Sequence, residues 1–524
     1  MPPTRRAALV LAGLLLSAGC TEGQEPAPGP PEGSRTLEDM VEAVGGDVLA
    51  ALQRGYHPDT STDIAFVPEP YNVVVRWSGV GLGTDDADPS TTHPTPWGYH
   101  QRVPLVLYGP GHIEPGSVST RPVDLTDVAP TFAWLLGKVT RFGHPLHNFD
   151  PQGRPLREGL GRPVPPDGVV APRVRPRVIV LVAYDGGGWN LLEQWTDAWP
   201  ELRRLMEEGT VFANATIGSA PAVTSAIHAN MGTGRYPSSH GMAEITGRLP
   251  DGTVGDLFFE HEADPRLLLD RTLADSWDLD TNNEAWVGMI GYESWHLGMM
   301  SHGADEIGTD RDVAVLWDPE QGNGEFFTNE ELYELPGYLP TTDDLMGRLD
   351  ALDGSDGAID GFWRGFDLAD PKVIPATPAF VEHEADALMR MIEHEPIGED
   401  QVTDLLSVEL KPSDFGGHLW NMVAQEEEEV LRAQDRVLGQ LVRALDRKVG
   451  RGEWVLAFTA DHGQTPLPET TGGLRIHPDI LGADVDSYFG RDIVQKMTPS
   501  GLFLDREAME AAGITLEEVA RFVG

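Results

Sequence analysis

Hydrophobic and polar positions alternate along this chain in two periods, which predict alternating strands and helices. Short apolar runs rich in β-branched residues predict strands at residues 71–77, 103–108, 177–184, 284–292, 403–410 and 453–460. The clearest helical pattern covers residues 421–448, where Val430, Val437, Leu441 and Leu445 recur on one face. We therefore expect an α/β fold with a mostly parallel central sheet flanked by helices on both faces.

Two long stretches lack this periodicity and suggest how the chain is divided. Residues 144–176 are rich in Pro, Gly and Arg, which is typical of a linker. Residues 249–400 are irregular and rich in Gly, Asp and Trp, so we expect a cap or insertion there. The catalytic core is then expected in residues 177–248 and 401–524.

The first 20 residues have the layout of an export signal. Arg5 and Arg6 precede an apolar run that is too short to span a membrane, and small residues follow it up to Cys20. The ending resembles a bacterial lipoprotein signal, in which Cys20 would be lipidated, and residues 21–35 form a Pro/Gly-rich tether. We expect a cell-surface or periplasmic lipoprotein, or a secreted protein if Cys20 is not lipidated. Because Cys20 is the only cysteine, a disulfide framework and a thiolate metal site are excluded.

The charge balance is strongly acidic, with 83 Asp and Glu against 38 Lys and Arg and a formal charge of -45. Such a surface repels nucleic-acid polymers and anionic membranes, so we expect neither as a partner, apart from membrane association through a lipid anchor. A small phosphoester substrate would need local positive charge, which bound metal ions would supply. The sequence does not indicate an oligomeric state.

Ligand-type side chains follow three of the expected strands. Asp185 comes directly after one strand, Asp414 and His418 follow the next, and Asp461 and His462 follow the last. The carboxyl ends of parallel strands meet at one edge of a sheet, so these side chains are expected to lie together. A single Asp after a strand is more often a helix cap or turn residue. Two Asp/His pairs and a further Asp suit Zn²⁺ or a similar divalent cation.

Thr224 is the candidate nucleophile. It follows a Pro-Ala-Val turn and precedes a short helical run, so it is expected at a helix N-terminus, where backbone N–H groups favour an incoming phosphate. Metal coordination would activate a hydroxyl that is otherwise too weak a nucleophile. The alternatives are that Thr224 only caps the helix, or that the neighbouring Ser225 is the nucleophile.

Taken together, these motifs resemble the alkaline phosphatase superfamily, and within it the nucleotide pyrophosphatase/phosphodiesterase branch. The matching positions are Asp185-Gly186, Thr224 with His228, the run from Thr233 to Pro237, Ser239-His240-Gly241, Asp414 with His418, and Asp461-His462-Gly463. The resemblance implies a hydrolase of phosphoric ester bonds with Thr224 as nucleophile and two Zn²⁺ ions or other divalent cations. It assigns one ion to Asp185, Thr224, Asp461 and His462, and the other to Asp414, His418 and one more His. His228 and His240 match no ligand, and we interpret them as structural.

The missing histidine suggests a circular permutation. In the family it lies in a T-H-G-S-P-like segment well after D-H-G, followed by V-P-L and a strand ending in Y-G. Here that segment stands first, as THPTPWGYH at residues 92–100, which contains His93, and VPLVLYG at residues 103–109. We therefore expect residues 36–143 to be the C-terminal part of the catalytic fold placed first, with His93 as the ligand. His477 is the alternative, but its context, LRIHPDI, lacks these neighbours.

Two departures from the family pattern concern the substrate. Ile245 stands where the branch has an Asn that holds a phosphate oxygen, and a Lys/Arg pair like that of the monoesterases is not found. We therefore expect diesters or pyrophosphates as substrates. The alternatives are a phosphomonoesterase of the same superfamily and a non-catalytic surface lipoprotein that retains the fold.

Overall fold

The computed structural model describes residues 48–75, 91–137, 146, 149–160, 175–259, 262–300, 311–319 and 324–524. The expected signal with Cys20, the tether and most of the expected linker lie outside these residues. Within the described ranges, no helix is both long enough and apolar enough to cross a membrane.

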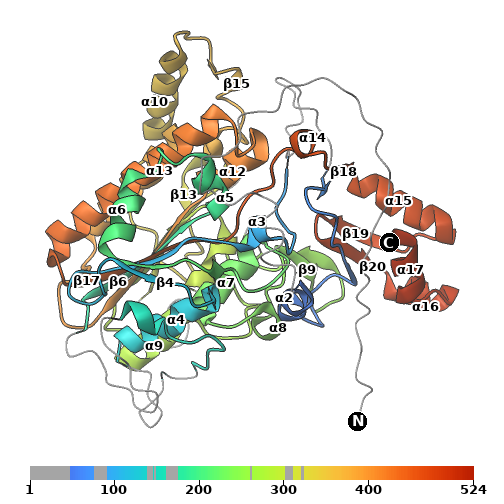
Figure 1. The fold of residues 1–524 in the computed structure, drawn as a ribbon, viewed down its shortest axis with the longest axis horizontal. Coiled ribbons are helices and arrows are strands. Elements are labelled where there is room, and N and C mark those ends of the chain that lie inside the picture. Colours follow the sequence, from blue (N-terminus) through green and yellow to red (C-terminus); the bar gives the residue numbers. More distant parts are fainter. Residues whose placement is uncertain are drawn as a thin grey trace.

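A nine-stranded sheet forms the centre of the described structure (Figure 1). Its strand order is β13 (Phe326–Phe327), β12 (Val313–Trp317), β11 (Val287–Gly291), β16 (Asp404–Leu410), β6 (Val178–Tyr184), β17 (Trp454–Ala460), β3 (Leu105–Tyr108), β7 (Thr210–Phe212) and β4 (Ser117–Ser119). The five strands from β12 to β17 pair in parallel, whereas β3 is antiparallel to both β17 and β7. The expectation of a mostly parallel sheet in an α/β fold is confirmed.

Helices cover both faces of this sheet (Figure 1). One layer contains α5 (Trp189–Gln194), α6 (Pro200–Glu208), α11 (Pro378–His394), α12 (Pro412–Leu419) and α13 (Gln425–Leu445); the other contains α4 (Val128–Leu135), α7 (Thr224–Thr233) and α9 (Leu273–Thr281). Strand β6 is buried throughout, and its alternate side chains enter the two cores: Val180 packs with the first layer and Leu181 with the second. A strand buried on both faces explains its unbroken apolar sequence.

The helix expected at residues 421–448 begins four residues later, at Gln425. Asn421 has a positive φ of 81°, a left-handed conformation that a helix interior does not accommodate. Val430, Val437, Leu441 and Leu445 are all buried, as the periodicity predicted.

The range 249–400 is only partly separate from the core. Strands β11 and β12 lie in the central sheet, and α11 packs against α13, so parts of this range also contribute to the core. The apolar run of β12 is only five residues long and lies between Asp312 and Asp318, so it offered little periodicity to detect. The part that stands apart contains α10 (Thr342–Asp353) and the hairpin of β14 (Phe362–Trp363) and β15 (Phe366–Asp367), at the top of Figure 1.

A small subdomain joins the two ends of the described chain. Strand β20 (Gly501–Leu504) pairs with β19 (Val494–Thr498) and with β1 (Ile64–Ala65), and α15 (Pro478–Phe489), α16 (Arg506–Ala512) and α17 (Leu516–Val523) lie beside them (Figure 1). The strand expected at residues 71–77 is present as β2 (Val73–Val74), which pairs with β18 (Arg475–Ile476) rather than with the central sheet. Residues 64–74 therefore interact mainly with the C-terminal segment.

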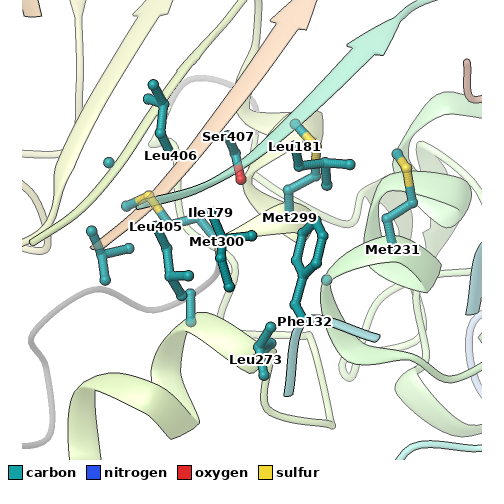
Figure 2. Close-up of a pocket in the computed structure, with 14 residues that line it drawn as sticks. Phe132, Ile179, Leu181, Met231, Leu273, Met299, Met300, Leu405, Leu406 and Ser407 are labelled. Carbon is teal, nitrogen blue, oxygen red and sulfur yellow. The ribbon is translucent and has the colours of Figure 1, made fainter. Parts of the chain in front are cut away.

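An apolar pocket lies between the sheet and the α4/α7/α9 layer (Figure 2). Side chains of β6, β11 and β16 form one side, and Leu273, Met231 and Met299 are among those on the other. Its lining is almost entirely hydrocarbon and thioether, so it lacks the polar groups that a phosphoester site requires.

Candidate metal centre

The candidate site lies where β11, β16, β6 and β17 end side by side. Tyr184, the last residue of β6, is in register with Leu410 of β16 and Ala460 of β17. The residues that follow these strands therefore emerge at the same level of the sheet edge.

The first group of potential ligands contains Asp185, Asp461 and His462, each fully buried. The Nε2 atom of His462 lies 3.2 Å from Asp185 Oδ1 and 3.2 Å from Asp461 Oδ2. None of these three atoms has a hydrogen-bond partner in the described structure. Buried polar atoms are normally paired, so three unpaired acceptor-type atoms directed at one point fit a divalent cation.

The second group contains Asp414, His93 and His462, and His418 lies beside Asp414. Asp414 Oδ1 is 3.4 Å from His93 Nε2, and Asp414 Oδ2 is 3.4 Å from His418 Nε2. The ring of His93 stacks on His462, with centroids 3.5 Å apart, and His462 belongs to both groups. The structure thus brings together all six Asp and His residues that the sequence singled out as ligands.

Each of the three histidines directs Nδ1 at a backbone carbonyl. His93 Nδ1 lies 2.8 Å from the Ala222 oxygen, His418 Nδ1 lies 2.6 Å from that of Thr91, and His462 Nδ1 lies 3.1 Å from that of Gly463. A Nδ1–H that donates to a carbonyl fixes the tautomer in which Nε2 carries a lone pair, the form that binds a cation.

Residues 91–100 form hydrogen bonds to α12 and to the segment that follows β17, which places His93 in the site. The Thr91 hydroxyl donates to Gly417 O at 3.0 Å, and the Thr465 hydroxyl donates to Thr92 O at 2.5 Å. His100 Nε2 lies 2.6 Å from the same Thr465 hydroxyl oxygen. By contrast, His477 stands at the N-cap of α15, and none of the ligand groups found among the described residues includes it.

Thr224 is the first residue of α7 and is 1 % exposed. The N-cap position belongs to Val223, so Thr224 is not the capping residue. The start of α7 is held against the ligand groups by the contact of His93 with Ala222, and His228 Nδ1 lies 3.8 Å from Asp461 Oδ2. The backbone N–H groups of the first turn of α7, which lack partners within the helix, are therefore close to the ligand groups.

The site carries concentrated negative charge. Burial, followed by repulsion from Asp185, raises the pKa of Asp461 to about 8. Burial lowers the pKa of His462, but Asp461 and Asp185 outweigh it and raise the value to about 9. The surroundings therefore keep a proton on the Asp461 carboxyl and add one to the His462 imidazole, which means that this site favours positive charge.

Three residues of the site were not predicted. Lys411 Nζ lies 2.8 Å from Asp185 Oδ2 and 2.7 Å from Asp414 Oδ2. His296 Nε2 lies 3.3 Å from Asp185 Oδ2 and 3.4 Å from Glu409 Oε2, which makes a third group of potential ligands. Lys411 and His296 follow strands, so the strand-end argument could have found them, whereas Glu409 lies inside a buried strand.

His228 and His240, which we interpreted as structural, form hydrogen bonds with neighbouring groups of the fold. His240 Nε2 lies 2.9 Å from the Asn230 amide, and His240 Nδ1 accepts from Met242 N–H at 3.1 Å. His228 Nδ1 donates to Thr224 O at 2.8 Å, and its ring meets His296 edge-on at 4.8 Å.

Comparisons with known proteins agree with this architecture. The chain is 25% identical over 399 residues to a protein of Myroides odoratus described as a calcium-transporting ATPase, covering 66% of this chain and 72% of that protein. It is 23% identical over 412 residues to alkaline phosphatase PafA of Elizabethkingia meningoseptica, covering 67% and 72% of the two chains. The crystal structure of PafA superposes with a TM-score of 0.56 at 21% identity, over 68% of this chain and 76% of PafA.

The sequence model of the type I phosphodiesterase / nucleotide pyrophosphatase family matches residues 179–484, which is more than half of the chain. That range includes the ends of β6, β16 and β17 and the start of α7. The chain therefore belongs to the type I phosphodiesterase / nucleotide pyrophosphatase family, a family of phosphoric ester hydrolases.

Proposed function

We propose that this protein is an exported hydrolase of phosphodiester or pyrophosphate bonds that uses Thr224 as nucleophile and two divalent metal ions, zinc in the first place. The observation that carries the proposal is the pair of buried ligand groups that meet at His462 beside the start of α7. Family membership supplies the reaction class.

The ligand atoms present fit two cations. Asp185, Asp461 and His462, with Thr224 beside them, would hold one ion, and Asp414, His418 and His93 would hold the other. Nitrogen and carboxylate oxygen donors of this kind suit Zn²⁺. When bound, such ions would act as Lewis acids that stabilise the Thr224 alkoxide and the oxygen of the leaving group.

The side chains of this chain then perform two displacement steps. The proton of the Thr224 hydroxyl passes to water, and Oγ1 forms a bond to phosphorus while the bond from phosphorus to the leaving oxygen breaks. The leaving oxygen then takes up a proton from water. Backbone N–H groups at the start of α7 bind the non-bridging oxygens of the phosphoryl group. Water then attacks the phosphothreonine, which releases the phosphorylated product and restores the hydroxyl.

The preference for diesters rests on charge. A monoester carries about two negative charges at neutral pH, and the described site offers one lysine, Lys411, already bound to two carboxylates. A diester carries a single negative charge and therefore needs less positive charge from the site. The alternative, a phosphomonoesterase, is supported by the name of the PafA relative.

Turnover of a nitrophenyl phosphodiester and a nitrophenyl phosphomonoester, with and without a chelator, tests the proposal. We expect faster turnover of the diester, loss with the chelator and recovery with Zn²⁺. A faster monoester reaction would favour the phosphomonoesterase. Absence of both reactions in protein that carries two metal ions would favour a non-catalytic lipoprotein. Release of a Cys20→Ala variant from the membrane fraction tests the lipid anchor separately.

The order of segments belongs to the same proposal: residues 36–143 form the C-terminal part of the catalytic fold, placed first. In support, β3 lies in the same sheet as β6, and His93 lies beside Asp414. The C-terminal Gly524 lines a pocket together with residues 64–69. A gene re-ordered to open between residues 161 and 174 and to join residue 524 to residue 48 through a short linker should therefore fold and retain metal binding.

A further inference from the structure

Asp185 lies between two clusters of polar side chains and presents a different oxygen to each. Its Oδ1 faces His462 in the first metal group, whereas its Oδ2 faces His296 and Lys411. Behind Oδ2 lies Glu409, which is fully buried and has no hydrogen-bond partner for Oε1 in the described structure. The cluster of Asp185, His296 and Glu409 is distinct from the six ligands of the proposed two-ion site, apart from the shared Asp185.

A further buried carboxyl group lies deeper in the core. Glu384 of α11 is 1 % exposed, and neither of its carboxylate oxygens has a hydrogen-bond partner among the described residues. Burial, with repulsion from Asp185 and Glu384, raises the pKa of Glu409 well above its ordinary value. Buried carboxyl groups in such proximity need a nearby cation or must remain protonated.

Lys411 supplies that cation. Its ammonium group is 3 % exposed and joins Asp185 Oδ2, at 2.8 Å, to Asp414 Oδ2, at 2.7 Å. These two carboxylates belong to different metal groups, so one ammonium links both halves of the site. The rings of Trp295 and Phe415 lie 5.7 Å and 5.4 Å from Nζ and shield it from water.

The ammonium group of Lys411 leaves little reason for a third metal ion at Asp185 Oδ2. His296 Nδ1 lies 2.9 Å from the Glu293 carbonyl oxygen and 3.1 Å from the Glu293 N–H group, and His296 Nε2 lies 3.3 Å from Asp185 Oδ2. A divalent ion bound to Asp185 Oδ2 would also lie close to an ammonium that already contacts the same oxygen. The ammonium group and the divalent ion are both positive, and two like charges in contact with the same oxygen repel strongly inside a protein.

We infer that Lys411 is a fixed internal cation that takes the place of a third metal ion at Asp185, His296 and Glu409 and positions Asp185 and Asp414 for a two-ion centre. The inference rests on the proposed two-metal function. In this role Lys411 is a positioning residue, because it acts through the carboxylates and not on the substrate.

Counting bound ions tests the inference. Full-length protein is stripped with a chelator, titrated with Mn²⁺, and the bound ions per chain are counted by elemental analysis and by the loss of the free Mn²⁺ resonance signal. We expect two ions in the wild type and in Lys496→Met, a matched variant at an exposed lysine of β19. We expect a third ion in Lys411→Met, two again in Lys411→Met with Glu409→Gln, and two in Lys411→Arg, which restores the charge.

A wild type that binds three ions would overturn the inference, and so would a folded Lys411→Met that binds two. A wild type that binds fewer than two ions would contradict the two-metal function itself, which keeps the two failures separate. If Lys411→Met does not fold, the anomalous difference map of a wild-type crystal soaked in Mn²⁺ decides. A peak among Asp185, His296 and Glu409 would then overturn the inference, and two peaks confined to the His93 and His462 groups would support it.

Discussion

His93 Nδ1 lies 2.8 Å from the carbonyl oxygen of Ala222, two residues before Thr224. The contact joins a proposed metal ligand from the first part of the chain to the turn that presents the proposed nucleophile. A shift of the imidazole ring would therefore shift the start of α7, so the proposed ligand His93 and the proposed nucleophile Thr224 are positioned together.

Replacing Thr224 with Ala should abolish hydrolysis while most of the bound metal is retained, because the six Asp and His ligands remain. The measurement is diester turnover together with metal content by elemental analysis. Thr233→Ala is a matched control at the other end of α7, where the Thr233 hydroxyl donates to Ala229 O at 2.6 Å. Wild-type turnover by Thr224→Ala, with loss in Ser225→Ala, would transfer the role to Ser225.

Replacing His93 with Ala should remove one of two metal ions and most of the activity. The reason is that Asp414 loses a neighbour whose Nε2 lies 3.4 Å from its Oδ1. His477→Ala is the control and should change neither quantity. Two retained ions in His93→Ala would show that His418 and His462 suffice for the second ion.

Removing the metal ions should lower the melting temperature. Because ions that bind only the folded state stabilise it, a free concentration of about 100 times the Kd adds about 2.7 kcal/mol. Asp461→Asn should reduce this metal-dependent shift, because it removes one ligand. Scanning calorimetry with chelator and with Zn²⁺ measures both effects, and an equal shift in wild type and Asp461→Asn would contradict the assignment of Asp461.

Stability should fall as the pH rises from about 4.5 to about 7 because of Glu244. Burial raises the pKa of Glu244 to about 7, against hydrogen bonds from Ser500 and Thr498 that lower it. The folded state thus holds a proton that the unfolded state has released, which costs about 3 kcal/mol of stability once the pH is above both values. Urea unfolding at pH 5 and pH 8 should show a smaller fall in stability in Glu244→Gln than in the wild type, because other buried carboxyl groups with raised pKa values, such as Asp461, contribute the rest of the slope. Glu510→Gln, at an exposed position of α16, is the control and should keep the slope.

The strands that carry the candidate ligands could be predicted from the sequence, because each is a continuous apolar run that ends abruptly at a polar residue. The expected strands at 177–184, 403–410 and 453–460 each match the structure within one residue. Helix α11 was missed although Thr377 and Pro378 form an N-cap and first-turn signature that was available to read.

Glu409 could not be predicted from pattern alone. It occupies one position of a strand buried on both faces, where the alternation of side chains gives no separate signal for a functional carboxylate. The partners of Lys411 also depend on how β6 and β16 align, and alignment is a property of the sheet rather than of either sequence segment.

The hydrogen bonds that fasten residues 91–100 connect positions 365 and 373 residues apart. During synthesis the segment that contains His93 leaves the ribosome long before Thr465 exists, so it waits without its binding partners while most of the chain is made. Contacts of such separation form late, because a long loop must close first. The first of the two proposed ions would therefore be bound only after Asp461 and His462 have been made, and a product that stops before residue 461 would lack both of these ligands.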